Sequence, residues 1–292
     1  MSDSITVAQV LQFNQNVYML SQQKGSKLRH LLRQKTTHAK KDSFDRMAPA
    51  TRPQVKVSRH QDTPLSLNIH DRRWQELLDF VHADLVDQED EIRILIDPAS
   101  IYAQNFAMAF GREYDHRIVA AFTADSDNGQ FGGTTAVFPA GNTLASGGTG
   151  LTVAKIREYK RRLDDKDVSQ ERRVAVVSPQ AMEDMLGLTE ITSSDYNTVK
   201  ALVQGSIEGN TWMGFQWVQL SPTILPIDGS LDRSCFFFQQ DGMGFMIGKD
   251  FKTAMDHRPD KMNALQIMCT ATFNAVRVDD DCVLQVFVRE TA

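Results

Sequence analysis

Residues 97–122, DPASIYAQNFAMAFGREYDHRIVAAF, constrain the fold of this 292-residue chain more than any other stretch. Large apolar side chains recur there at every fourth position, at Tyr102, Phe106, Phe110, Tyr114, Ile118 and Phe122. This spacing places them on one face of an α-helix, and an Asp97-Pro98 start is typical of a helix N-terminus. The sequence therefore predicts a single helix about 37 Å long, with its apolar face buried.

Gly111 is the exception inside this predicted helix, because glycine there costs about 1 kcal/mol relative to alanine. Close approach of a second backbone segment would explain why a glycine stands at this position. Asn105, Arg112, Asp115 and Arg117 lie largely off the centre of the apolar stripe.

The composition is that of a soluble globular protein, with 41% hydrophobic and 24% charged residues, and no run is long enough for a membrane helix. The first residues lack the basic and apolar pattern of a signal peptide. Cys235, Cys269 and Cys282 form no Cys-x-x-Cys pair, and an odd count argues against a disulfide framework. We expect them to be reduced, small core residues of an intracellular protein.

Charge is unevenly distributed along the chain. No acidic residue stands between Asp3 and Asp42, although the net charge of the whole chain is −5. The same interval contains seven basic residues, Lys24, Lys27, Arg29, Arg33, Lys35, Lys40 and Lys41. A basic arm on an acidic body indicates contact with nucleic acid or with an acidic partner, and a solvated, mobile tail is the alternative. Upstream, residues 5–20 predict a weak amphipathic helix.

Residues 47–70 predict a two-stranded ribbon. Val55 and Val57 alternate with polar residues before the turn SRHQDTP, and Leu65, Leu67 and Ile69 alternate with polar residues after it. Since the ribbon has few large apolar residues, it cannot bury much against its own body and either moves freely or lies on a neighbour.

Periodicity predicts the remaining elements. Helices are expected at 71–85, 151–163 and from Ser178-Pro179 through 186, and strands at 92–96, 174–177, 235–238, 244–247, 251–255, 265–275 and 282–288. The stretch 123–149 is rich in Gly, Ser and Thr and predicts a loop or loose hairpin between two regions.

The sequence contains none of the common catalytic or metal-binding motifs: it has no Gly-x-Ser-x-Gly, no His-Glu-x-x-His and no paired-cysteine site. The run Asp279-Asp280-Asp281 predicts a solvated hairpin turn rather than a metal site, and His257 lies in a charged segment that predicts a salt-bridged corner. We therefore predict no catalytic residue, no cofactor and no metal.

The order of several segments carries a family resemblance. An Asp-Pro start leads to a long helix with AFGREYD, followed by a Gly/Thr-rich hairpin, LTVAKIREYKRRLDD, VAVVSPQAMEDML, SSDYNTVKALVQGSIEGNTWMGFQW, an HRPDK turn and a strand with NAVRV. From about residue 94 to 288 the chain resembles the major capsid proteins of tailed bacteriophages, which have the Hong Kong 97 fold.

The resemblance implies an α+β fold divided into four parts. Residues 1–41 would be an N-terminal arm, and 42–70 an extended β-ribbon loop. A peripheral domain would comprise 71–128 and 249–292, with the spine helix at 98–122. An α/β axial domain would comprise 129–248.

The resemblance also implies a structural, non-enzymatic role. The chain would assemble from pentamers and hexamers into the icosahedral head of a phage, formed in the host cytoplasm and enclosing double-stranded DNA. The expected neighbour-contact residues are Val55, Lys56, Val57, Arg59, Leu65 and Leu67, and the seven basic arm residues would face the interior or the DNA. The arm is short, which implies a separate scaffolding protein, and a portal protein is a further expected partner. Nothing marks Lys56 as a crosslinking residue.

Three other hypotheses stay open at this point. An encapsulin-like nanocompartment shell would share the fold, and an encoded cargo enzyme with a docking tail would favour it. An α/β enzyme with an unrecognised site would show a deep pocket with converging titratable groups. A DNA-binding protein using the basic arm would lose salt-sensitive binding when the residues before Lys41 are deleted.

Overall fold

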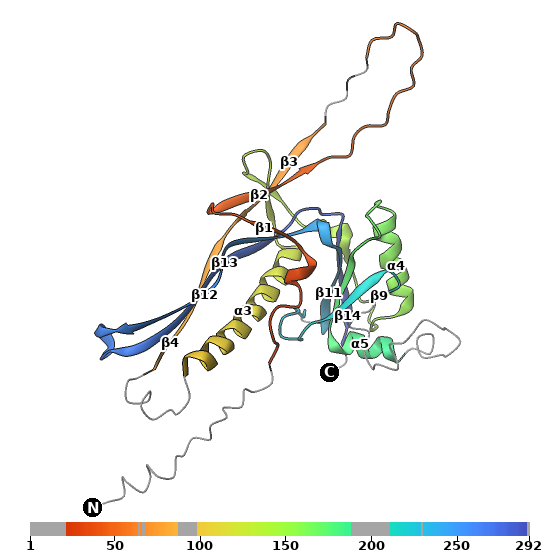
Figure 1. Cartoon of the computed structure of the whole chain (residues 1–292). Helices are drawn as coiled ribbons and strands as arrows, with labels where there is room; N and C mark the ends of the chain where they lie inside the picture. Colours follow the sequence, from red (N-terminus) through yellow and green to blue (C-terminus); the bar gives the residue numbers. More distant parts are fainter. Residues whose placement is uncertain are drawn as a thin grey trace, which may run out of the picture.

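The computed structural model describes residues 22–63, 65, 68–86, 98–187, 211–228 and 230–290. Its body consists of two sheets on either side of one long helix, and a third, small sheet carries a long projecting hairpin (Figure 1). The predicted helix at 5–20, the predicted strand at 92–96 and Leu67 lie outside the described residues.

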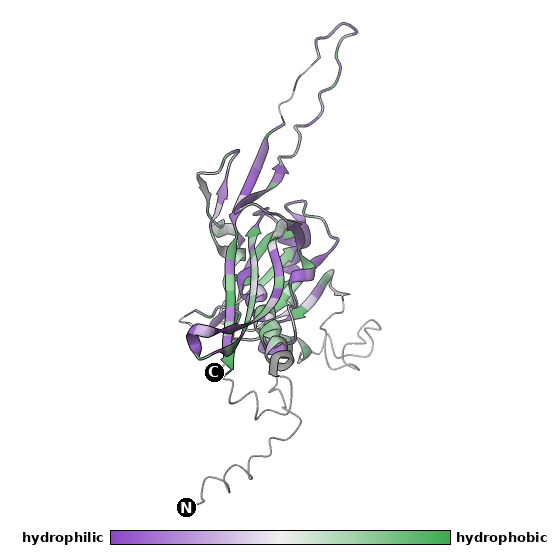
Figure 2. Ribbon diagram, turned by 60° about the vertical axis from the view of Figure 1, so that its left-hand side comes forward, coloured by the Kyte–Doolittle hydropathy of each residue, from purple (hydrophilic) through white to green (hydrophobic). Residues whose placement is uncertain are grey.

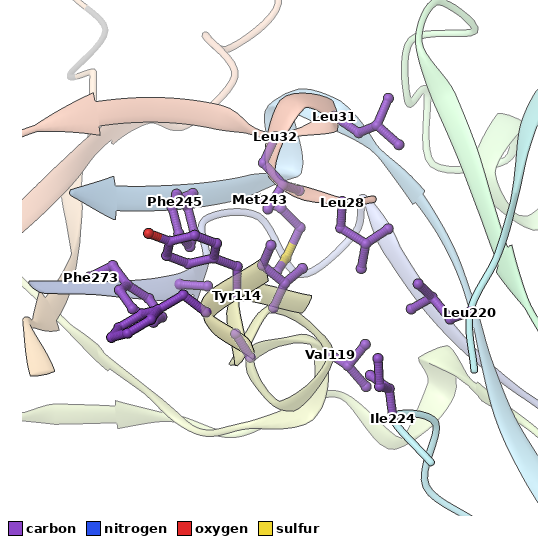
Figure 3. Packing of buried hydrophobic residues seen from close by; sticks show 14 of the residues in the cluster. Leu28, Leu31, Leu32, Tyr114, Val119, Leu220, Ile224, Met243, Phe245 and Phe273 are labelled. Carbon is purple, nitrogen blue, oxygen red and sulfur yellow. The ribbon is translucent and has the colours of Figure 1, made fainter. Parts of the chain in front are cut away.

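The long helix, α3 (Pro98–Thr123), confirms the main prediction. It packs on a four-stranded sheet, here called sheet A, whose order is β1-β12-β13-β4. The strands are β1 (Arg33–Thr36), β12 (Met243–Arg258), β13 (Ala264–Arg277) and β4 (Leu78–Val86). The side chains of Phe106, Phe110, Tyr114, Ile118 and Phe122 are all buried, as the four-residue spacing predicted. Figure 3 shows Tyr114 against Phe273 of β13, with ring centroids 4.4 Å apart.

A six-stranded sheet, sheet C, lies on the other side of α3, and its order is β7-β14-β11-β8-β10-β9. The strands are β7 (Thr143–Leu144), β14 (Val283–Arg289), β11 (Asp232–Gln239), β8 (Arg173–Val177), β10 (Phe215–Gln219) and β9 (Thr211–Trp212). One face of β11 packs Phe236 and Phe238 against Phe122 of α3. The other face packs Phe237 in a second core with α4 (Val153–Asp164) and α5 (Pro179–Leu186). Strand, cap and helix at 173–186 match the prediction, since Ser178 accepts a hydrogen bond from the Ala181 N–H.

Sheet B has the order β2-β3-β5-β6, from β2 (Lys41–Met47), β3 (His70–Glu76), β5 (Ser126–Asn128) and β6 (Thr134–Ala136). Its hydrophilic β2–β3 stem stands apart from the mostly hydrophobic strands of the body (Figure 2). Phe44 of β2 packs onto Gly244 of β12, where an added Cβ would lie 2.2 Å from the ring. This close packing seats sheet B on sheet A.

Four short 3₁₀ turns complete the described elements, at Arg29–Leu31, Ala140–Asn142, Gln240–Gly242 and Pro259–Lys261. The strands predicted at 244–247 and 251–255 are one continuous strand, β12, with register shifts between Ile247 and Lys252. The resemblance assigned residues 249–292 to the peripheral domain. Strand β14 of that range pairs with β11 and β7 of sheet C rather than with sheet A. The division into four parts itself stays a prediction.

The predicted helix at 71–85 is wrong, because this segment forms β3 and β4. The spacing of Leu77, Val81 and Leu85 looked helical, yet Val81 and Leu85 are exposed in the structure. Phe80 lies instead on Phe273, with ring centroids 4.3 Å apart, and β4 pairs with β13 from Leu78↔Phe273 to Val86↔Leu265. Backbone pairing with a strand nearly 200 residues away outweighs the local pattern here.

The prediction of a two-stranded ribbon at 47–70 is wrong about which residues form the strands. A hairpin does project from the body, but its paired strands are β2 and β3, and their ladder ends at Met47↔His70. The described residues between 48 and 69 carry no strand, so the alternation around Val55 and Val57 does not reflect pairing within this chain.

The alternative of a mobile tail is wrong for the basic stretch after Gly25. Leu28, Leu31 and Leu32 are buried in the main core, and β1 pairs in parallel with β12. These three leucines stand between the basic residues and anchor the segment, a contribution that the charge pattern concealed.

Candidate interaction surfaces

The arm, residues 22–36, is seated on α3 by one buried carboxylate. Asp115 is fully buried, and its carboxylate accepts hydrogen bonds from the Ser26 hydroxyl at 2.6 Å and the backbone N–H groups of Lys27 and Leu28 at 3.0 Å. Gln23 also donates its side-chain amide to Asp115. Charge-assisted bonds of this kind fix a segment in one geometry. Leu28 then enters the core beside the helix (Figure 3).

Two glycines allow the arm to come this close. A Cβ on Gly111 would lie 2.6 Å from the carbonyl carbon of Gly25, which is closer than real Cβ contacts come. Gly25 itself has φ +75°, in the left-handed region that favours glycine. The expected reason for Gly111, close approach of a second backbone segment, is confirmed, and that segment is the arm.

Arg29 holds the next part of the arm. Its guanidinium donates two hydrogen bonds of 3.3 Å to Asp250 and lies 5.1 Å from the centre of the Tyr114 ring. Partial burial raises the pKa of Asp250. The hydrogen bonds from Arg29 and from the Phe251 N–H lower this pKa by more than burial raises it, so the net shift is downward. The charged form of Asp250 is therefore the one that the arm stabilises.

Four more of the predicted interior- or DNA-facing residues have partners within the chain. Lys27 Nζ donates to the Gln219 carbonyl at 2.9 Å, and Lys35 Nζ lies 2.8 Å from Asp42. Lys40 pairs with Glu76 at 2.8 Å, and Lys41 pairs with Asp127. These contacts, together with that of Arg29, tie the basic stretch to sheets A, B and C.

Lys24 and Arg33 differ from these five. Both are exposed, and within the described residues neither has a carboxylate partner; Arg33 lies over the Phe44 ring at 5.6 Å. The hypothesis of an interior- or DNA-facing surface stays a prediction, and these two residues are its best placed members.

The hairpin exposes the residues predicted to contact a neighbour. Val55, Val57 and Leu65 have 83%, 87% and 93% of their surface exposed, and Lys56 and Arg59 are exposed beside them. Isolated apolar side chains on a surface are common, but three on one hairpin loop make this segment a candidate contact surface. The neighbour contact stays a prediction.

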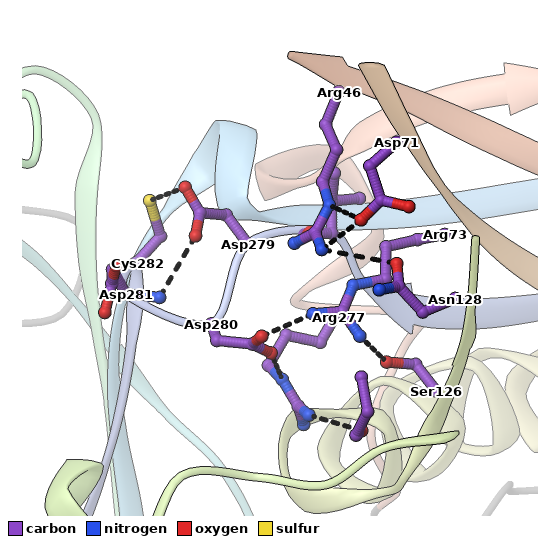
Figure 4. A network of polar contacts seen from close by, with 12 residues as sticks. Arg46, Asp71, Arg73, Ser126, Asn128, Arg277, Asp279, Asp280, Asp281 and Cys282 are labelled. Carbon is purple, nitrogen blue, oxygen red and sulfur yellow. Dashed lines mark hydrogen bonds and ion pairs between the residues drawn. The ribbon is translucent and has the colours of Figure 1, made fainter. Parts of the chain in front are cut away.

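A polar cluster at the hairpin base escaped the sequence analysis (Figure 4). Arg46 and Asp71 form an ion pair across β2 and β3, and Arg73 and Arg277 both pair with Asp280. The chain does turn at 279–281, but the predicted hairpin is wrong, because β13 pairs with β12 and β4 whereas β14 pairs with β11 and β7. Nor is Asp280 the solvated residue that the run of aspartates suggested. Arg277 stands only three residues before Asp280, but no local pattern could have shown the second partner, Arg73, because it lies on β3.

Nothing in the described residues resembles a catalytic or metal centre. No group of three or more His, Cys, Asp or Glu side chains there could hold a metal ion. The groove between β4 and α3, about 320 Å³, contains one carboxylate, that of Glu113, which pairs with Arg117. Burial raises the pKa of Cys235 to about 12, so its thiol stays protonated at neutral pH. The three cysteines are free, although Cys282 is half-buried rather than in the core.

The family comparison settles what kind of protein has this geometry. The family model described as phage capsid protein matches residues 5–290. The chain belongs to the phage capsid protein family. It is a capsid shell protein, and membership implies a structural role, association with copies of itself and a place in the virion.

Solved capsid structures have the same fold. The capsid of Ralstonia phage GP4 matches with a TM-score of 0.70 at 10% identity, covering 94% of each chain. The capsid of cyanophage P-SCSP1u matches with a TM-score of 0.69 at 14% identity, covering 94% of this chain and 92% of the other. Cyanophage Pam1 matches with a TM-score of 0.68 at 10% identity over 95% of each chain. No curated protein matches the chain. The described helices of this capsid protein include none that is long and apolar enough to cross a membrane.

Proposed function

We propose that residues 48–69 of the hairpin lie on an adjacent copy of the chain and that this contact builds the shell. The observation that carries the proposal is the exposure of Val55, Val57 and Leu65 on a segment whose described residues form no strand. Covering such a side chain contributes about 1.5–3 kcal/mol. A contact repeated at every subunit of a closed assembly need not be strong by itself, because each subunit makes several.

The finer function follows from the same proposal. Copies form pentamers and hexamers that close into an icosahedral head around double-stranded DNA, with a separate scaffolding protein and a portal protein as partners during assembly in the host cytoplasm. Membership of the phage capsid family supports this proposal. The exposed Lys24 and Arg33 would contact DNA phosphates without sequence preference.

Deleting residues 55–67 tests the hairpin contact. We expect the deleted chain to fold, because the described residues of this segment contribute nothing to the core. It should sediment as small species under conditions in which the unaltered chain forms closed shells visible by electron microscopy. Closed shells of normal appearance from the deleted chain would refute the proposal.

A set of substitutions distinguishes the effect of losing the apolar side chains from the effect of shortening the loop. Val55, Val57 and Leu65 are each replaced by serine, and the matched control replaces Thr51, Gln54 and Thr63 of the same hairpin by serine. We expect the first set to block shell formation and the control to assemble. Equal behaviour of the two sets would show that the apolar side chains do not make the contact.

A further inference from the structure

One buried cluster connects the hairpin to the body. Arg73, on strand β3 of the hairpin stem, has a side chain only 1% exposed. One of its Nη atoms donates to the Ser126 hydroxyl at 2.7 Å, and the other pairs with Asp280 in the turn between β13 and β14 (Figure 4).

The same aspartate also connects to the end of the long helix. Arg277 Nε donates to Asp280 at 2.6 Å, and Arg277 Nη1 donates to the carbonyls of Phe122 and Ala124, at 2.8 and 2.9 Å. Asp280 thus lies between the hairpin strand on one side and the C-terminal end of α3 on the other.

Backbone pairing attaches the stem only weakly at this side. The ladder between β3 and β5 has two residue pairs, Arg73↔Asn128 and Trp74↔Asp127. A short ladder permits the stem to tilt, whereas a planar guanidinium held at two points restrains it. Phe44 on Gly244 and Arg46 on the Val278 carbonyl also hold the stem, and on the β3 side the restraint comes from the side chain of Arg73.

Stabilisation of the fold alone does not explain why this cluster is ionic. Two buried guanidiniums share the carboxylate of Asp280, and Arg73 Nε is buried without a hydrogen-bond partner among the described residues. Well-packed apolar residues commonly stabilise such a site at least as well, so an ionic cluster is better explained by the geometry that it imposes.

We propose that Arg73, held by Asp280 and Ser126, is the positioning residue that fixes the direction of the hairpin relative to α3. That this direction sets how the hairpin meets an adjacent copy rests on the proposed function; the restraint within one chain does not.

A distance measurement on the single chain tests the restraint. Spin labels are attached at Met47→Cys, on the exposed end of β2, and at His116→Cys, on the exposed side of α3, in a Cys282→Ser background. The variant is Arg73→Gln, which leaves Asp280 and Arg277 as a one-to-one pair. The matched control is Arg72→Gln, the neighbouring arginine, which pairs only with the exposed Asp45.

We expect Arg73→Gln to broaden the distribution of label distances about twofold while the helix content stays unchanged, and Arg72→Gln to leave it as it was. A distribution as narrow as that of the unaltered chain would overturn the proposal. If Arg73→Gln does not fold, Arg73→Lys decides: it keeps the charge beside Asp280 but cannot also reach Ser126, so an unchanged breadth would again overturn the proposal.

Shell formation gives a separate readout. Aberrant shells from Arg73→Gln but not from Arg72→Gln are expected if the hairpin also makes the neighbour contact. A broadened distribution with normal shells would sustain the positioning role of Arg73 and count against the proposed function of the hairpin.

Discussion

At the scale of the residue, Gly111 decides whether the arm can lie on the helix. Its missing Cβ leaves room for the backbone of Gly25. The cost is the low helix propensity of glycine. The sequence signalled that something had to approach closely at this position. It did not signal what, because the partner segment lies 86 positions upstream and carries no pattern that points to this contact.

Substituting Gly111 by alanine should destabilise the protein. The added methyl would meet backbone rather than a flexible side chain, and overpacking of this kind costs about 1–3 kcal/mol, of which better helix propensity returns up to about 1 kcal/mol. We expect a net loss of about 1–2 kcal/mol, measured by the midpoint of denaturant unfolding.

His116→Ala, at an exposed position of the same helix, is the control and should change stability by less than about 0.5 kcal/mol. A Gly111→Ala protein more stable than the original would mean that the arm is not held against this turn of the helix.

At the scale of the element, the basic composition of the arm suggested a different environment from the one that it has in the structure. Its basic residues suggested a mobile tail, yet its three leucines are buried, and five of the seven basic residues from Lys24 to Lys41 have partners within the chain. Strand β4 shows a similar difference, since a helical spacing of apolar residues was overridden by pairing with β13. Both outcomes depend on contacts between segments far apart in the sequence.

Replacing Asp115 by asparagine should release the arm. An amide in place of the carboxylate loses the charge that four donors of the arm share and turns an N–H₂ group toward them. We expect a loss of about 2–4 kcal/mol in unfolding free energy. Trypsin should then cleave faster after Lys24, Lys27 and Arg29, as followed by mass spectrometry.

Glu113→Gln is the matched control for this substitution. Glu113 lies on the same helix and pairs only with Arg117 at the surface, so its loss should leave the cleavage rate unchanged. Equal cleavage of the two variants would contradict a role of Asp115 in seating the arm.

At the scale of the whole molecule, ion pairs attach the arm to the body and join the strands of sheet B. Arg29–Asp250 holds the arm on β12, and Lys41–Asp127 and Arg46–Asp71 lie within sheet B. The hydrogen bond from Lys41 lowers the pKa of Asp127. Burial raises the pKa of Asp71. The hydrogen bonds from Arg46 and from the Arg72 N–H, together with the charge of Arg46, lower this pKa by more, so the net shift is downward.

These shifts fix the sign of the pH dependence. A carboxyl whose pKa is lower in the folded than in the unfolded chain stabilises the fold above its unfolded value of about 4, and this contribution is lost as the pH falls through the folded value. We expect the unfolding free energy to be nearly constant from about pH 7 to 5 and to fall between about pH 5 and 2.

Denaturant midpoints measured across this range provide the test. The decline should be shallower for Asp71→Asn, which no longer has this carboxyl to protonate, than for the unaltered chain. Stability that rises on acidification would contradict the assignment of these pairs.

The sequence alone determined the elements that depend on near neighbours: the long helix from its four-residue stripe, the Ser178-Pro179 start of α5, and the half-buried strand β13 from its alternation. The order of its segments also led to the capsid family. Only the tertiary structure decided that 71–85 is strand, that the arm is seated on Asp115 and that Asp280 also holds Arg73 of the hairpin stem. Those features depend on backbone pairing and buried charges between residues tens to hundreds of positions apart, and a local pattern cannot encode which distant segment will be its partner.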